Sequence, residues 1–179
     1  DFYYSSEDKT GNYPKYYKTM QDKLKLEQQK LSRKVLKSNN WYKQKKVISK
    51  IQTKIANQRK DWLHKESTRL CNEFDAIIFE DIDLRGMAQC LKLGKNLSNN
   101  GFGMFRVYCK YKLEERGKQF IKIDKWYPSS KKCNDCGYIK EDLQLSDREW
   151  ICPECGSIHN RDYNASLNIK EAGQSLLAW

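Results

Sequence analysis

The sequence contains no long apolar run, because its longest uninterrupted hydrophobic stretches are four residues each, at 76–79 and 176–179. A membrane-spanning helix needs about 20 such residues, and no segment resembles a secretory signal. These absences exclude a membrane protein and predict a cytoplasmic one. The 179 residues suffice for one medium domain with a small appended module, and we find no internal repeat.

Acidic residues are scarce between residues 14 and 65, where three of them face fourteen lysines and two arginines. This segment carries a net charge of +13 and the whole chain +11, so the remainder sums to −2. Two apolar patterns with near-helical spacing predict a helical hairpin over about 15–74, and an asparagine in the turn at 37–40 is expected to cap the second helix. The patterns consist of Met20, Leu24, Leu31 and Val35, then Ile48, Ile51, Ile55, Trp62, Leu70 and Phe74.

The lysine-rich side of this hairpin has two interpretations. Ordinary solvation of a charged helix is one. The other follows from the shortage of acidic partners: such a surface attracts the phosphates of nucleic acid with a strong salt dependence. Charge alone does not distinguish DNA from RNA. On the second interpretation the nucleic-acid-binding residues are Lys43, Lys46, Lys50, Lys54 and Arg59.

After the hairpin the sequence period changes, which predicts a mixed α/β protein. Short apolar or alternating runs predict strands, and a glycine after an apolar pattern predicts the end of a helix. The expected elements are a buried strand over 76–80, a loop over 86–101, a helix over 103–115 closed by Gly117, a strand over 119–126, and a helix over 162–171 closed near Gly173.

The seven cysteines predict a metal site rather than a disulfide scaffold. Cys71, Cys90 and Cys109 stand alone and are expected to be small buried hydrophobic residues. The other four form a C-x2-C-x15-C-x2-C pattern in which a glycine follows each pair, as expected for a tetrahedral structural zinc, with iron as the alternative. His159 is expected to be a bystander, because four sulfurs saturate the metal. The predicted zinc ligands are Cys133, Cys136, Cys152 and Cys155.

Two acidic residues stand at the ends of predicted elements. Glu80 ends the first strand and Asp162 begins the last helix. Phosphodiester cleavage by two Mg²⁺ ions requires carboxylates from separate elements, which both positions suit. The alternatives are an exposed acid at a strand end for Glu80 and a helix N-cap for Asp162.

Five segments occur in one order: residues 57–61, Phe79-Glu-Asp-Ile82, residues 124–131, the cysteine quartet and Arg161-Asp-Tyr-Asn-Ala-Ser-Leu-Asn-Ile169. Together they resemble the C-terminal half of the TnpB (OrfB) family of transposon-encoded RuvC-like nucleases, also called transposases, which are relatives of the type V CRISPR nucleases. The resemblance implies a RuvC-type, RNase H-like α/β sheet with a lysine-rich helical insertion and a zinc ribbon. It also implies Mg²⁺-dependent, RNA-guided cleavage of DNA.

The same resemblance assigns roles to individual residues. It implies that Glu80 is the second catalytic acid, Asp162 the third, and Arg161 the arginine beside it. It makes the four cysteines the ribbon's zinc ligands and places Arg59 in the helix that touches the guide–target duplex. The expected division is a RuvC-like nuclease domain over 1–132, a zinc ribbon over 133–158, and a final RuvC-like segment over 159–179.

The sequence departs from the family pattern at two places. Residues 1–4 do not offer the Asp-x-Gly or Asp-x-Ser setting of the first catalytic acid, and Asn160 stands where relatives often have aspartate. We therefore expect a sheet that is incomplete at its N-terminus. One alternative function is a zinc-ribbon module that binds nucleic acid without cleaving it, and another is an inactive remnant of a transposon gene.

Overall fold

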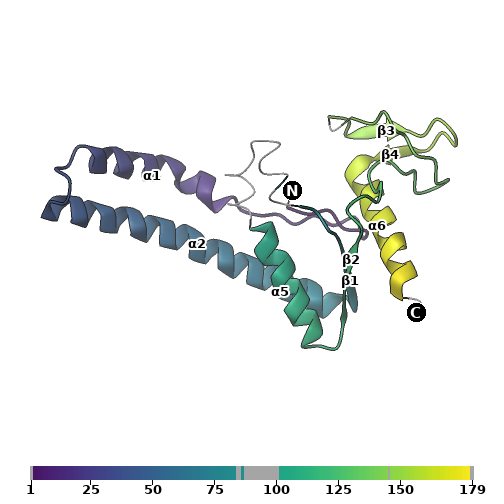
Figure 1. Ribbon diagram of the computed structural model, residues 1–179, viewed down its shortest axis with the longest axis horizontal. Helices are drawn as coiled ribbons and strands as arrows, with labels where there is room; N and C mark the ends of the chain where they lie inside the picture. Colours follow the sequence, from purple (N-terminus) through teal and green to yellow (C-terminus); the bar gives the residue numbers. More distant parts are fainter. Residues whose placement is uncertain (1, 84–85, 87–100, 145, 178–179) are drawn as a thin grey trace.

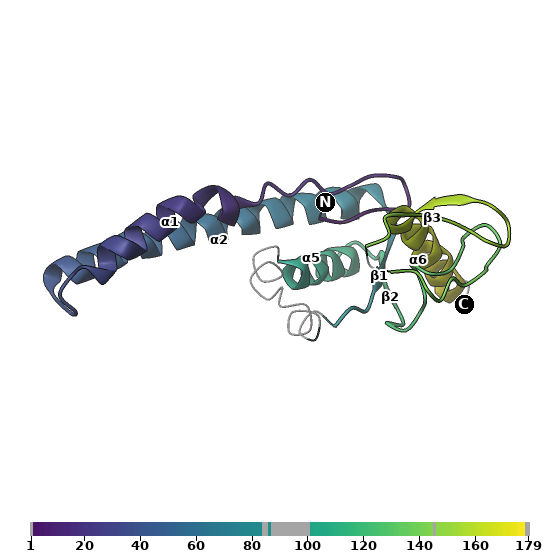
Figure 2. The same ribbon diagram turned by 90° about the horizontal axis from the view of Figure 1, so that it is seen from above.

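The computed structural model describes residues 2–83, 86, 101–144 and 146–177. Helices α1 (Tyr16–Ser32) and α2 (Asn39–Glu73) run side by side as a long arm (Figures 1 and 2). The arm projects from a compact part that contains β1 (Ala76–Glu80), α5 (Phe102–Glu114) and β2 (Gln119–Ile123). At the opposite end lie β3 (Glu149–Ile151), β4 (Ile158–Asn160) and α6 (Arg161–Leu177).

The two helices predicted over 15–74 are therefore present. Their contact is a buried apolar cluster of Leu24, Ile48, Ile51 and Ile55, as the apolar patterns predicted. Val35 was expected in the same contact, and this is wrong: its side chain is 78% exposed. The reason is that α1 ends at Ser32, so Val35 falls in the turn. No helix in the described part of the chain is long and apolar enough to cross a membrane.

The turn between the helices is closed by a serine rather than by an asparagine. The Ser38 hydroxyl accepts a hydrogen bond from the backbone N–H of Trp41 at 3.2 Å, and Lys37 takes the left-handed conformation with φ 62°. Asn39 and Asn40 are already helical. The predicted asparagine cap is therefore wrong, because the hydroxyl one residue earlier satisfies the free N–H of the first turn.

The main core lies where α2, α5 and the N-terminal segment meet. Leu63 and Leu113 have no exposed surface, and α5 comes close enough to α2 that a Cβ on Gly101 would lie 2.9 Å from Leu63 Cδ1. Lys112 is buried here and donates hydrogen bonds to three oxygens of α2. The buried members of this core are Phe2, Tyr13, Leu63, Leu70, Cys71, Phe105, Cys109 and Leu113.

Strands β1 and β2 pair in parallel, in register from Ala76 opposite Gln119 to Glu80 opposite Ile123. Every residue of β1 is only half-buried, so the prediction of a buried strand is wrong. Among the described residues β1 pairs with β2 alone, and its surroundings include an apolar groove of about 650 Å³. Strand β2 is three residues shorter than expected, because the Asp124 side chain accepts from the Trp126 N–H and begins a turn.

Helix α6 begins where the Asn160 side chain caps it, accepting from the N–H groups of Asp162 and Tyr163 at 3.1 Å each. It was expected to end before Gly173, but it continues to Leu177. Gly173 instead lets the helix pack closely on β1, because a Cβ there would lie 2.5 Å from Ile78 Cγ2. The observed ends of the other elements agree with the prediction more closely: α5 starts one residue early, and Gly117 follows it with φ 65°.

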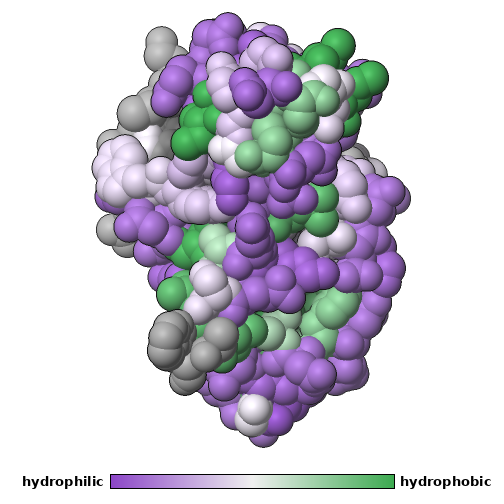
Figure 3. Space-filling view, turned by 90° about the vertical axis from the view of Figure 1, so that its right-hand side faces the viewer, coloured by the Kyte–Doolittle hydropathy of each residue, from purple (hydrophilic) through white to green (hydrophobic). Residues whose placement is uncertain are grey.

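Most of the predicted loop over 86–101 lies outside the described residues, as does Cys90. Cys71 and Cys109 are fully buried, as predicted for single cysteines. Viewed from the end that carries β3, β4 and α6, the surface shows hydrophobic patches separated by hydrophilic ones (Figure 3).

Candidate functional site

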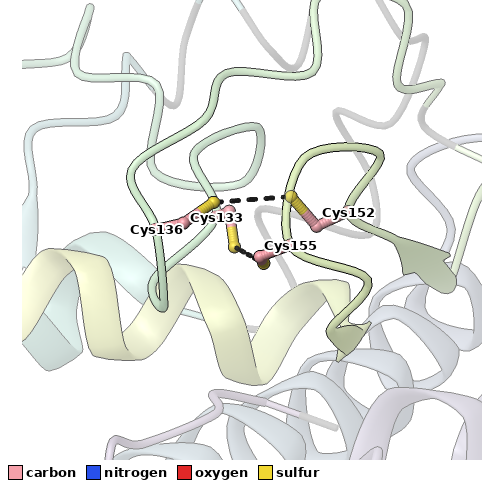
Figure 4. Close-up of side chains that lie close together, drawn as sticks. All are labelled: Cys133, Cys136, Cys152 and Cys155. Carbon is pink, nitrogen blue, oxygen red and sulfur yellow. Dashed lines mark hydrogen bonds between the residues drawn. The ribbon is translucent and has the colours of Figure 1, made fainter.

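The four predicted zinc ligands come from two loops and point toward one another (Figure 4). Both loops have the same hydrogen bonds: Gly137 N–H donates to Cys133 O and Gly156 N–H to Cys152 O, each at 2.9 Å. These glycines have φ values of 81° and 75°, which a side chain would strain. The glycine after each cysteine pair is thus required by the turn, as the sequence predicted.

The sulfur atoms are spaced as a tetrahedral zinc site requires. Cys133 Sγ lies 3.7 Å from Cys155 Sγ, and Cys136 Sγ lies 3.6 Å from Cys152 Sγ. All four sulfurs lie within 4.8 Å of one another. Four Zn–S bonds of about 2.3 Å would place the sulfurs about 3.8 Å apart. The cluster therefore fits a zinc ion held by four thiolates, a closed site that leaves no position for a substrate.

The thiols of this cluster differ in acidity. Hydrogen bonding with the Ser157 side chain, 3.3 Å away, lowers the pKa of Cys155 to about 6. Burial raises the pKa of Cys133 instead.

His159 lies outside the group of four sulfurs but contacts one of them. Its Nε2 lies 3.0 Å from Cys133 Sγ, and its buried ring packs against Trp150 at 4.7 Å between centroids. Strand pairing accounts for the contact, because His159 is directly opposite Trp150 in the β3–β4 register. The sequence analysis predicted neither of these short strands, so it gave no signal for the inward position of His159.

Two buried asparagines of α6 attach the ribbon to the helix, and sequence reasoning did not identify them. Asn164 donates to Lys132 O at 2.7 Å and accepts from the Asn134 N–H at 3.0 Å. Asn168 donates to the carbonyls of Ser129 and Lys132 at 2.8 and 2.7 Å. Both side chains are at most 1% exposed. Their spacing of four residues on one helical face explains why both asparagines occur in the 161–169 segment.

Glu80 lies at the C-terminal end of β1, half-buried, and lines the apolar groove. Desolvation raises the pKa of its carboxyl group, and the hydrogen bond from Ser129 Oγ to Oε2, at 3.4 Å, opposes this only in part. A carboxylate in such a place costs free energy unless a cation or a proton neutralises it. The position therefore suits a metal ligand.

Asp162 lies in the first turn of α6, and its side chain is 49% exposed. Arg161 Nη2 approaches its Oδ1 at 3.3 Å, and Arg148 Nη1 approaches its Oδ2 at 3.5 Å. The predicted N-cap role belongs to Asn160 instead. The Arg148 side chain is 73% exposed, so its ion pair with Asp162 contributes little.

Glu80 and Asp162 thus contact different residues: Glu80 contacts Ser129, and Asp162 contacts Arg148 and Arg161. Within the described ranges, both groups of three or more potential metal-binding side chains include Cys133, and neither contains Glu80 or Asp162. Residue 1 lies outside the described residues.

The predicted nucleic-acid-binding residues divide into two sets. Four lysines of α2 are exposed and follow one another at steps of three, four and four residues, which places them on one face of the helix. Arg59 is half-buried and its Cδ lies beside Gly101, so it is on the side that faces the core. The exposed set, called here the lysine stripe, is Lys43, Lys46, Lys50 and Lys54.

The chain is similar to proteins whose names describe nucleases. It is 36% identical over 160 residues to a Streptomyces pristinaespiralis protein named "Putative RNA-guided DNA endonuclease", and 32% identical over 173 residues to InsQ of Escherichia coli K12, which has the same description. These alignments cover 89% and 88% of this chain. The chain spans only 40% and 43% of the length of these relatives.

A solved structure has a similar fold. The protein in the cryo-EM structure of a Cas12f1–sgRNA–target DNA complex matches with a TM-score of 0.59 and 19% identity, over 84% of this chain and 40% of that chain. The match shows a shared mixed α/β fold.

Two family models match successive parts of the sequence. Residues 102–169, from α5 into α6, match the Cas12f1-like TNB domain. Residues 2–91, half of the chain, match the model OrfB_IS605, described as "Probable transposase". This chain therefore belongs to the OrfB_IS605 transposase family, as its resemblance to the TnpB (OrfB) proteins indicated.

Proposed function

We propose that this chain is the nuclease portion of an RNA-guided DNA endonuclease of the transposase family, with DNA and a guide RNA as partners. The observation that carries the proposal is Glu80, a desolvated carboxylate at the C-terminal edge of a parallel β-strand. Ligand sites of open α/β sheets lie at this edge. The names of the two relatives and of the similar complex support the same activity.

In this proposal Glu80 and Asp162 hold Mg²⁺, which when bound stabilises the charge that develops at a phosphodiester. Their oxygen ligands are of the type that Mg²⁺ prefers. Ser129 fixes the orientation of the Glu80 carboxylate by its hydrogen bond. Arg161, whose side chain is only 13% exposed, holds the Asp162 carboxylate from one side.

The proposed fold is an RNase H-like, RuvC-type sheet that is incomplete in this chain, with α1 and α2 as an insertion. Two observations support an additional strand beside β1. Sheets usually have four to six strands, whereas β1 and β2 are the two strands of this sheet among the described residues. The apolar groove is lined by all five residues of β1 together with residues 2–7 and side chains of α5 and α6. The proposed domains remain 1–132, 133–158 and 159–179.

Cleavage tests the catalytic part of this proposal. The purified chain is incubated with Mg²⁺ and end-labelled single-stranded DNA. We expect cleavage that Glu80→Gln and Asp162→Asn abolish. The matched control is Glu114→Gln, which removes an exposed carboxylate of α5 and should cleave like the unmodified protein. Metal-dependent binding without any cleavage would contradict the nuclease proposal and favour the non-cleaving module.

The salt dependence of binding tests the lysine stripe. Each phosphate contact contributes about 0.7–0.9 to the slope of log K against log salt concentration. We expect Lys43→Gln with Lys46→Gln to reduce the slope by roughly one and a half. The charge-matched control replaces Lys110 and Lys140, which already pair with Glu114 and Asp142. Equal changes for both double variants would show that only net charge matters.

A further inference from the structure

Trp126 is a large aromatic side chain that the fold leaves in water. It is 80% exposed and lies three residues after the end of β2. A tryptophan gains more than most residues from burial, and its area in water is a cost to the folded protein. The packing of the described chain gives no reason for a tryptophan at this position.

The backbone that carries this side chain is held in place. Asp124 Oδ1 accepts from the Trp126 N–H at 2.7 Å, and Asp124 O accepts from the Tyr127 N–H at 3.1 Å. Tyr127 O in turn accepts from the Ser129 N–H at 2.7 Å. The indole is therefore presented to solvent by an ordered turn, which reduces the entropy lost when a ligand binds to it.

Both ends of this turn lie beside Glu80. At the start, Ile123 is the strand partner of Glu80. At the end, the Ser129 hydroxyl donates to the Glu80 carboxylate. Trp126 is three residues from each of them, so its backbone lies at the same edge of the sheet as the proposed catalytic acid.

A cation accompanies the exposed ring. Lys125 Nζ lies 4.9 Å from the centroid of the Trp126 indole, within cation–π distance. An aromatic face beside a positive charge is the combination that binds unpaired nucleic acid, since a base stacks on the ring and the cation attracts the neighbouring phosphate. A duplex, whose bases are already stacked, has no free base face to offer.

We propose that Trp126 is a stacking platform for an unpaired nucleobase of the strand that reaches Glu80, with Lys125 facing the adjacent phosphate. The inference rests on the proposed function for the identity of that strand. It adds a positioning residue outside the acidic site, because a base stacked on Trp126 fixes where along the strand the phosphodiester meets Glu80.

Binding without metal tests the platform independently of cleavage. The probe is single-stranded DNA containing 2-aminopurine, whose fluorescence falls when the base stacks. We expect Trp126→Ala to weaken binding about 5- to 150-fold, the range for loss of one base–aromatic stack, and to remove the quenching. Trp126→Phe should retain most of both. The matched control Tyr42→Ala removes another exposed aromatic, on the arm, and should leave the quenching unchanged.

Three outcomes decide the question. Loss of quenching in Trp126→Ala, with unchanged zinc content and with duplex binding unaffected, supports the platform. Quenching and affinity equal to those of the unmodified protein overturn it. Equal loss of single-strand and duplex binding also overturns it, because stacking on a free base would then not be involved. The result is separate from the cleavage test, since Glu80→Gln should still quench.

Discussion

The arm and the zinc ribbon reach stability by different means. The arm, α1 and α2, buries a continuous apolar seam of Leu24 and three isoleucines and then joins the main core. In the described part of the ribbon, residues 133–144 and 146–158, the buried apolar cluster consists of Leu143 and Trp150 with Cys133 and Cys152. So short a segment cannot bury enough apolar surface to fold alone, and small modules of this size depend on metal or disulfides. The chain therefore combines side-chain packing in the arm with a cluster of four cysteines in the ribbon that fits a metal ion.

Their attachments to the rest of the molecule differ in the same way. The arm continues into the main core through apolar side chains such as Leu63 and Leu70. Residues 129–134, which lead into the ribbon, are attached to α6 through the polar side chains of Asn164 and Asn168. The difference predicts that metal removal and core mutations will affect separate parts of the protein.

Loss of zinc should give the largest effect and test the comparison most directly. Structural zinc contributes about 10–16 kcal/mol in small modules. We expect Cys133→Ser, or a chelator, to abolish zinc binding and the near-UV circular dichroism of Trp150 while most far-UV helical signal remains. Cys71→Ser, which replaces a cysteine of the main core, should keep full zinc content. Simultaneous loss of the helical signal would show that arm and ribbon form one cooperative unit.

A cavity in the main core should have the reverse effect of zinc loss: it should destabilise the core and leave the zinc site intact. Leu63→Ala removes a fully buried side chain between α2, α5 and Gly101. We expect the free energy of unfolding, from urea titration, to fall by about 2–5 kcal/mol with zinc content unchanged. Leu36→Ala, at a side chain 69% exposed in the turn of the arm, should change it little. Loss of zinc in Leu63→Ala would contradict the separation.

Breaking the hydrogen bonds that attach the ribbon to α6 should give the next largest loss of stability. Asn168→Ala leaves the buried carbonyls of Ser129 and Lys132 without this donor, which we expect to cost about 2–4 kcal/mol. Hydrogen exchange should increase at residues 129–134 while the zinc remains bound. The control Asn134→Ala removes only the acceptor-side contact of the same asparagine and should have a smaller effect.

Adding one methyl group at Gly173 should weaken the packing of α6 on β1. Gly173→Ala places a carbon 2.5 Å from Ile78 Cγ2, so we expect a loss of about 1–3 kcal/mol, even though alanine favours helix. Ile78→Ala in the same protein should recover part of it, as a double-mutant cycle would measure. A more stable single variant would mean that the helix shifts freely on the sheet.

The smallest expected effect is on the pH dependence of stability. It arises at Glu66, where the N-terminal segment packs on α2. Burial alone would raise the pKa of Glu66, but hydrogen bonds from Arg69 and Tyr3 outweigh it and hold the pKa below the usual value. A depressed carboxyl pKa stabilises the fold above the unfolded pKa, near 4.3, and this contribution is lost as pH falls through the folded value. The stability difference between the unmodified protein and Glu66→Gln should therefore shrink between pH 6 and pH 3. A constant difference would exclude this linkage, and Glu114→Gln serves as the exposed control.

Patterns with strong local causes were predictable from the sequence. The period of Ile48, Ile51 and Ile55 specified a helix face, and the glycine after each cysteine pair specified a turn. The approach of α6 to β1 was not predictable, because a glycine signals either a helix end or a close contact, and only Ile78 decides which. The burial of Lys112 was not predictable either, since its three acceptors lie in another helix more than forty residues away.

The candidate site shows the same limit. Spacing alone identified four thiolates, since they lie in two short turns. The contacts of Glu80 with Ser129 and of Asp162 with Arg148 depend on elements brought together by the fold. The asparagines at 164 and 168 had a local spacing signal, but their partners in 129–134 did not.

Helix α2 has a mechanical consequence. Its 35 residues, about 52 Å in length, lead into β1 with only Phe74 and Asp75 between them, and β1 ends at Glu80. A force applied at the far tip of the arm would therefore act through one stiff rod on the strand that carries the carboxylate. The lysine stripe and the strand that carries Glu80 are thus joined through one uninterrupted helix.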